Sequence, residues 1–224
     1  GMEGGSGVAD VLTGRVNPCG RLSDTIARSI EDYPSSSCFG DQYRNFYTED
    51  IYVGYRYFET TAKDKVLYPF GFGLSYTHFS METLEFAEDS DSISLKIAVA
   101  NEGEYPGRQV VQVYVNPPQG VLGKPLRSLA SFAKTRVLMP GEKEELPFTI
   151  WKKELASYDD SGATGHKSCY VLEEGTYRFF AGEDVRSAAL CGSFTQPELK
   201  VTQQLEEALA PVTPFFRLKP EAVC

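Results

Sequence analysis

Apolar and polar residues alternate along most of the chain after residue 78, as they do in strands with one buried face. The clearest run is 93–99, where isoleucine, leucine or valine occupies every second position. The same pattern predicts strands over 111–115, 131–138, 144–150, 168–172, 176–181 and 188–194. About seven short strands without long helices between them predict a two-sheet sandwich of the immunoglobulin or fibronectin III type. The Cys…Trp…Cys spacing of antibody domains is missing, which favours the fibronectin III-like form over residues 78–195.

Residues 1–77 have a different pattern and do not read as a complete domain. A short helix near the start is predicted by apolar residues at helical spacing, namely Val8, Val11 and Leu12. Ser6 is placed to cap this helix and Gly14 to end it. Residues 23–49 form a long polar excursion, and alternation at 51–55 predicts a strand. One helix and one or two strands cannot bury a core alone, so we expect an incomplete α/β segment that needs a neighbour.

Residues 196–224 form a third segment. Apolar residues after Pro197 share one helical face: Val201, Leu205, Ala208 and Leu209. Three later prolines then force an extended course. The expected organisation is therefore a mainly β chain, in which the sandwich follows the α/β segment and leads into a helix and an extended linker.

The composition is ordinary for a globular protein, with 42% hydrophobic and 24% charged residues. The formal net charge of −9 argues against a nucleic-acid partner, because nucleic-acid binding requires a basic surface. No apolar run is long enough to cross a membrane, and no signal peptide is visible at the start. The five cysteines have no CxxC spacing. Reduced thiols in a cytoplasmic protein are the simplest account, with one disulfide in an exported protein as the alternative.

The stretch between residues 49 and 77 is the most specific part of the chain. It reads Glu-Asp-Ile-Tyr-Val-Gly-Tyr-Arg-Tyr-Phe, then a short polar stretch, then Tyr-Pro-Phe-Gly-Phe-Gly-Leu-Ser-Tyr-Thr. Together with residues 1–5, 9–12 and 17–22, this order resembles the late part of the second, α/β domain of family 3 glycoside hydrolases. Residues 78–195 resemble the fibronectin III-like domain that follows it in many members, through positions that include Asn101, Gly103, Gly107, Pro140 and Gly182.

The resemblance implies a non-catalytic C-terminal fragment of a retaining, β-glucosidase-like enzyme. In this family the nucleophile is an aspartate on a (β/α)8 barrel, and the acid/base glutamate usually lies earlier in the second domain than this chain begins. Glu3 belongs to the family's Gly-x-Glu-Gly-Gly turn, so neither catalytic carboxylate is expected here. The fragment alone is expected to be inactive and to need no cofactor.

The implied partners are the missing barrel and the remainder of the α/β domain, with a β-glucoside or related carbohydrate as substrate of the parent. The fragment would scaffold the barrel and shape one edge of the cleft. The tail resembles the lead-in to a barrel that follows in a subset of the family, so the barrel's position before or after this chain stays open. Unpaired strand edges and uncovered apolar surface predict self-association of the isolated fragment.

An aromatic loop supplies the candidate sugar-binding residues, which are Asp41, Tyr43, Phe46, Tyr47 and Glu49. Aromatic rings stack on sugar rings and carboxylates accept hydrogen bonds from hydroxyls. The competing interpretation is that these rings anchor the loop to a neighbouring domain, and we prefer it. The later aromatic residues, among them Tyr55, Phe58 and Phe70, are likewise predicted to form an interdomain core.

Other chemistry has little support. The two histidines, His78 and His166, lack metal-ligand spacing, and adjacent carboxylates such as Asp159-Asp160 are typical of turns. The alternative function is a stand-alone carbohydrate- or protein-binding β-sandwich module, which a row of exposed aromatic residues on a sheet face would favour.

Overall fold

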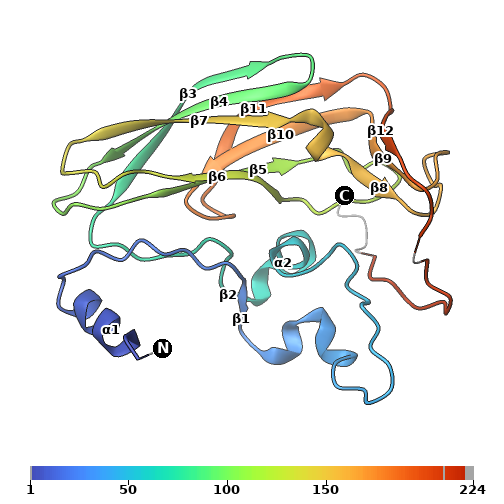
Figure 1. Cartoon of the computed structure of the whole chain (residues 1–224), viewed down its shortest axis with the longest axis horizontal. Helices are drawn as coiled ribbons and strands as arrows, with labels where there is room; N and C mark the ends of the chain where they lie inside the picture. Colours follow the sequence, from blue (N-terminus) through green and yellow to red (C-terminus); the bar gives the residue numbers. More distant parts are fainter. Residues whose placement is uncertain (1, 209, 220–224) are drawn as a thin grey trace.

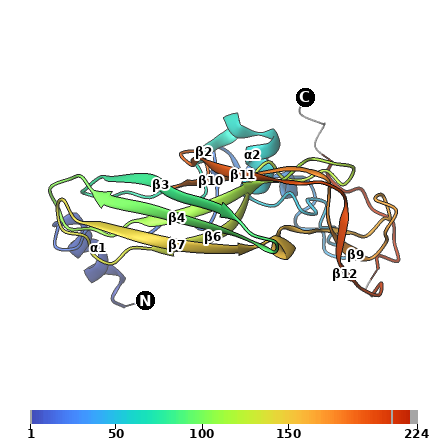
Figure 2. The ribbon, with the colours of Figure 1, turned by 90° about the horizontal axis from the view of Figure 1, so that it is seen from above.

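The computed structural model describes residues 2–208 and 210–219. Its larger part is a sandwich of two antiparallel sheets, which lies across the top of Figure 1 and is seen from above in Figure 2. One sheet has the order β3-β4-β7, with β3 Phe79–Glu88, β4 Ser92–Asn101 and β7 Lys143–Trp151. The other has the order β11-β10-β5-β6, with β5 Val110–Asn116, β6 Ser128–Lys134, β10 Gly175–Gly182 and β11 Ala189–Gln196. The predicted mainly β sandwich is confirmed.

The alternating apolar residues of the strands meet between the two sheets. Every second residue in the middle of β4 is at most 2% exposed, namely Ile93, Leu95, Ile97 and Val99. Val111 and Val113 of β5 and Phe179 of β10 are fully buried in the same cluster. Burial of each such side chain stabilises the fold by about 1.5–3 kcal/mol. The period of two therefore places the core, because successive side chains of a strand point to opposite faces.

Two sandwich strands differ from the expected pattern. β3 is not predicted because its register against β4 shifts between Thr83 and Glu85, and such a bulge breaks the alternation of faces. β6 ends at Lys134 and does not reach residue 138. Beyond it, Leu138 is paired with Gly107 in an isolated bridge.

A third, smaller sheet has the order β12-β9-β8, with β8 Ser157–Asp159, β9 Cys169–Leu172 and β12 Lys200–Gln204. The strand expected at 168–172 forms here and not in the sandwich. The helix expected in the tail is wrong, because residues 200–204 pair with β9 and Val201 lies opposite Val171. β-branched residues such as Val201 and Thr202 fit a pleated sheet well. Leu209, part of that helix prediction, lies outside the described residues.

The first part of the chain contains the expected helix, α1 Gly4–Leu12. Its N-cap position is Glu3 and Ser6 lies inside the helix, so the predicted cap is wrong. No residue of α1 is buried. β1 Ile26–Ala27, which lies within the polar excursion of residues 23–49, pairs with β2 Val66–Tyr68. Two 3-10 turns follow β1 in the excursion, η1 Ile30–Asp32 and η2 Pro34–Ser37.

The strand expected at 51–55 is also wrong. Gly54 has a φ of 57° and turns the chain into α2 Tyr55–Thr61. Phe58 of α2 is fully buried in a small core, whose other buried members are Ala27, Ala62 and Val66. The Tyr33 ring meets Phe58 edge-on, with centroids 5.4 Å apart. A 3-10 turn, η3 Lys63–Lys65, connects α2 to β2.

Four free thiols lie within residues 2–208 and 210–219, those of Cys19, Cys38, Cys169 and Cys191, while Cys224 lies outside the described residues. No helix in the same residues is long and apolar enough to cross a membrane. The cytoplasmic location stays a prediction.

Candidate functional site

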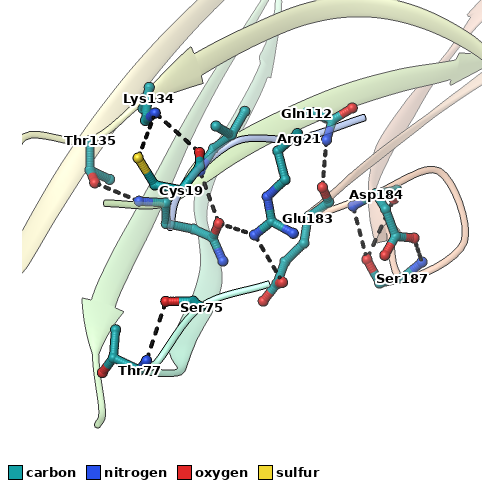
Figure 3. A network of polar contacts seen from close by, with 12 residues as sticks. Cys19, Arg21, Ser75, Thr77, Gln112, Lys134, Thr135, Glu183, Asp184 and Ser187 are labelled. Carbon is teal, nitrogen blue, oxygen red and sulfur yellow. Dashed lines mark hydrogen bonds and ion pairs between the residues drawn. The ribbon is translucent and has the colours of Figure 1, made fainter. Parts of the chain in front are cut away.

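A polar network centred on Arg21 joins the first part of the chain to the sandwich (Figure 3). The Arg21 guanidinium donates to the Glu183 carboxylate at 3.1 Å and to the side-chain oxygen of Gln109. The Arg21 side chain is 13% exposed and the Glu183 side chain 39%, so water screens this ion pair in part. Gln112 of β5 donates to the Glu183 carbonyl. Arg21 is thus tied to Gln109, the residue before β5, and to the loop that follows β10.

Asn17 connects residues 2–77 to the sandwich at a second place within this contact region, which we call the junction. Its amide nitrogen donates to the Pro106 carbonyl at 2.9 Å, and its amide oxygen accepts from the Tyr76 N–H at 2.9 Å. A Cβ at Gly107 would lie 2.8 Å from Asn17 Nδ2, so only glycine leaves room for this contact. The start of the sandwich is thereby fixed to the segment that follows α1.

The glycines of the aromatic motif allow close backbone approach. The Gly71 N–H donates to the Leu22 carbonyl, and the Leu22 N–H donates to the Phe72 carbonyl, both at 2.8 Å. Gly71 has a φ of 84°, and a Cβ there would lie 2.5 Å from Gln112 Nε2. A Cβ at Gly73 would lie 2.4 Å from the Gly20 carbonyl oxygen. The motif therefore packs the junction together.

An aromatic cluster fills the junction beside α2. The rings of Tyr55 and Phe70 lie 4.5 Å apart, and both meet Tyr114 of β5 edge-on. Burial raises the pKa of Tyr114 well above its usual range, and its hydroxyl donates to Gln112 at 2.7 Å. The predicted interdomain core is confirmed for Tyr55 and Phe70.

A second ion pair ties α2 to the sandwich. Glu59 is 3% exposed, and its carboxylate accepts from Arg186 Nε at 2.8 Å. Arg186 also donates to the Lys63 carbonyl at 2.8 Å. Nearby, the guanidinium of Arg127 lies 3.4 Å from the centroid of the Phe180 ring. Burial lowers the pKa of Arg127, although the negative charge of Glu59 opposes that shift.

The candidate sugar-binding residues lie on the exposed loop after η2, and their side chains do not share one environment. The Asp41 carboxylate accepts from the backbone N–H groups of Tyr43 and Arg44, each at 2.8 Å, and these hydrogen bonds lower its pKa. Tyr43 and Tyr47 are 91% and 75% exposed. Phe46 stacks on the tail residue Phe215, with centroids 5.9 Å apart.

Glu49 is partly exposed, and its carbonyl accepts from the Tyr52 N–H at 2.8 Å. Its carboxylate makes no hydrogen bond or ion pair with the other four candidates within the described part of the chain. Sugar binding by this loop stays a prediction.

A groove that the sequence pattern did not predict lies between this loop, the β5–β6 connection and the third sheet. Its volume is about 1130 Å³, and its lining includes Tyr52, Arg56, Tyr158, Tyr170 and Arg217. The sequence signal that points to this groove is the alternation of exposed and buried residues in β8 and β9. It turns Tyr158 and Tyr170 outward and their neighbours Asp159 and Val171 inward. Across residues 2–208 and 210–219, no three His, Cys, Asp or Glu side chains gather as a metal site.

Two family descriptions match the chain. Residues 1–76 match the glycosyl hydrolase family 3 C-terminal domain, and residues 109–185 match the fibronectin type III-like domain. Over 97% of its length the chain is 51% identical to a β-glucosidase of Ruminococcus albus, and over 95% it is 43% identical to β-glucosidase A of Butyrivibrio fibrisolvens.

Solved structures give the same result. A β-glucosidase from Paenibacillus barengoltzii superimposes on 94% of the chain with a TM-score of 0.91 and 50% identity. β-Glucosidase 3B from Thermotoga neapolitana, in complex with α-D-glucose, covers 90% with a TM-score of 0.80 and 39% identity. The chain spans 23% and 28% of the two curated relatives, and 24% and 28% of the two structures.

Proposed function

We propose that this chain, which belongs to glycoside hydrolase family 3, is the non-catalytic scaffold of a β-glucosidase-like enzyme. It comprises the family's C-terminal domain and the fibronectin III-like domain. In this proposal the remainder of the α/β domain and a (β/α)8 barrel pack against residues 2–77. The complete enzyme hydrolyses terminal β-linked glucosyl residues with retention, and this chain shapes one edge of its cleft.

The observation that carries the proposal is the contrast between the two sides of residues 2–77. On the side of the sandwich they are bound by Arg21, Glu59 and the aromatic cluster. α1, in contrast, buries none of its residues, and its apolar Val8 and Leu12 are 59% and 77% exposed. A nine-residue helix is marginal in water and gains its stability from packing of its apolar face. A further domain against α1 supplies that packing.

The carboxylates of the junction support a scaffold role. Glu183 is paired with Arg21, and Glu59 is paired with Arg186. A catalytic carboxyl group has to reach the substrate, whereas these two are held in ion pairs with arginine side chains. Retaining hydrolysis also requires two carboxyl groups about 5–5.5 Å apart across the scissile bond. The proposal therefore assigns both to the rest of the enzyme.

A chimera tests the proposal. The matched 218 residues of the Ruminococcus albus β-glucosidase are replaced by this chain, and hydrolysis of an aryl β-glucoside is measured. We expect an active chimera, an inactive isolated chain and an inactive relative from which the 218 residues are deleted. Turnover by the isolated chain that is abolished by a carboxylate substitution within it would contradict the proposal. So would a folded chimera without activity.

The isolated chain should also self-associate, because its uncovered apolar surface remains exposed to water. Analytical ultracentrifugation measures this directly. Val8→Glu combined with Leu12→Glu on α1 should shift the chain toward monomer, and Val212→Glu, which alters an exposed tail residue, should not. Equal association of the unmodified chain, the α1 double variant and Val212→Glu would show that α1 is not the surface through which the chain self-associates.

A further inference from the structure

The groove beside the third sheet has the dimensions and the surface of a ligand site. Its volume of about 1130 Å³ is slightly above the ~300–1000 Å³ typical of small-molecule sites. Its walls come from the loop before α2 with the start of α2, the β5–β6 connection, the segment from the end of β7 to β9, and the tail. Figure 1 shows the red tail returning from β12 toward the blue loop, which closes this end of the molecule.

Two exposed aromatic rings form one wall. Tyr158 of β8 and Tyr170 of β9 are cross-strand partners, with ring centroids 5.3 Å apart and planes inclined by 55°. They are 41% and 38% exposed, although each carries a large apolar face. Aromatic faces of this kind are suited to the apolar faces of pyranose rings, which carry C–H groups above and below the ring.

The charges on the walls balance. Three carboxylates, Asp50, Glu154 and Asp160, line the groove with three cations, Arg56, Arg217 and Lys219. The other lining cation, Lys124, is buried and paired with Glu173. A polyanion or a polycation would meet like charges here, whereas a neutral ligand with many hydroxyls finds both donors and acceptors.

Part of this hydrogen-bonding capacity is free. The side chains of Arg56 and Glu154 are exposed and have no ion pair or side-chain hydrogen bond within the described part of the chain. Their guanidinium and carboxylate groups can bind vicinal hydroxyls with two parallel hydrogen bonds each.

The walls are also held in place before any ligand binds. Arg217 lies 2.5 Å from the Asp160 carboxylate and 3.5 Å from that of Asp50, which bridges the loop and the third sheet. The Leu218 N–H donates to the Thr48 carbonyl at 2.7 Å, so the tail runs along the loop. A preformed site loses less conformational entropy on binding.

We propose that this groove binds a neutral gluco-oligosaccharide. Tyr158 and Tyr170 stack on its pyranose rings, while Arg56 and Glu154 bind its hydroxyls. The choice of a β-linked, glucose-based sugar rests on the proposed function. The site itself rests on the paired aromatic rings, the balanced charges and the volume of the groove.

Titration of the 224-residue chain with cellotetraose, followed by calorimetry and by saturation-transfer NMR, tests the site. We expect saturable binding that Tyr158→Ala and Tyr170→Ala each weaken at least tenfold. Tyr105→Ala is the matched control, because Tyr105 is 57% exposed and lies outside the groove, and it should bind like the unmodified chain. Tyr170→Phe retains the ring and should keep affinity within about threefold, which separates lost stacking from lost folding.

Three outcomes would overturn the proposal. The first is no binding by the folded chain. The second is binding by both alanine variants with the same affinity as the unmodified chain. The third is binding that Tyr43→Ala abolishes while the groove variants retain it, which would move the sugar surface to the exposed loop. An active chimera together with a chain that does not bind cellotetraose would refute the groove and leave the scaffold function standing.

Discussion

Replacement of Asp159 by asparagine should destabilise the fold by about 3 kcal/mol. Asp159 is fully buried, and its Oδ2 accepts from the Thr164 N–H at 2.8 Å and from the Thr164 hydroxyl at 2.7 Å. An asparagine nitrogen in that position donates and cannot accept. Hydrogen bonds to a charged acceptor contribute about 1.5–3 kcal/mol each, so losing two costs about 3–6 kcal/mol. The Thr164 hydroxyl can rotate and accept from the new amide, which places the expected value near the lower end.

The same substitution should change how stability depends on pH. Burial raises the pKa of Asp159, but hydrogen bonds from Thr164, Gly162 and Ser161 outweigh it and hold the pKa far below its usual value. A lowered pKa in the folded state contributes stability that is complete above the unfolded pKa of ~3.9 and is lost as pH falls below it. The difference between the unmodified chain and Asp159→Asn should therefore be constant from about pH 7 to 5 and shrink below about pH 4.

Urea unfolding followed by circular dichroism measures both effects. Asp160→Asn is the matched control, because Asp160 is exposed and its pair with Arg217 should contribute about 1 kcal/mol or less. Equal loss of stability in the two variants would refute the reasoning. A difference for Asp159→Asn that persists unchanged at pH 3 would refute the electrostatic part alone.

Three further substitutions probe the junction and the core. Gly71→Ala should lower Tm more than Gly141→Ala. The two glycines have similar φ values, 84° and 79°, but only at Gly71 would a Cβ collide with other atoms. Equal Tm shifts of the two variants in a thermal melt would contradict the close approach at Gly71. Glu173→Gln should cost about 3–5 kcal/mol in urea unfolding, because it leaves the buried Lys124 unpaired, and a neutral result would show that this charge is otherwise compensated. Arg21→Ala should speed hydrogen exchange in residues 13–77 while the sandwich exchanges as before; unchanged rates would show that Arg21 does not hold the junction.

The candidate site was predictable only in part. The aromatic composition of residues 49–77 is sufficient to expect an interdomain core, since large rings so close together need a shared apolar environment. The partners of Arg21 were not predictable, because Gln109 and Glu183 lie 88 and 162 positions away. The groove has walls from four separated segments, and no local pattern reports which distant segments meet.

The sequence by itself determined the sandwich, its main core residues and the family, because period-two burial and an unusual local motif are both properties of neighbouring residues. Tertiary structure decided the rest. The pattern at 200–204 was compatible with a helical face, but β9 offered backbone partners and Val201 joined its sheet. Alternation at 51–55 suited a strand, but the turn at Gly54 and the buried pocket for Phe58 made α2. In short segments local preferences differ by a few tenths of a kcal/mol to about 1 kcal/mol, so a distant contact that buries a side chain or pairs a strand decides the outcome.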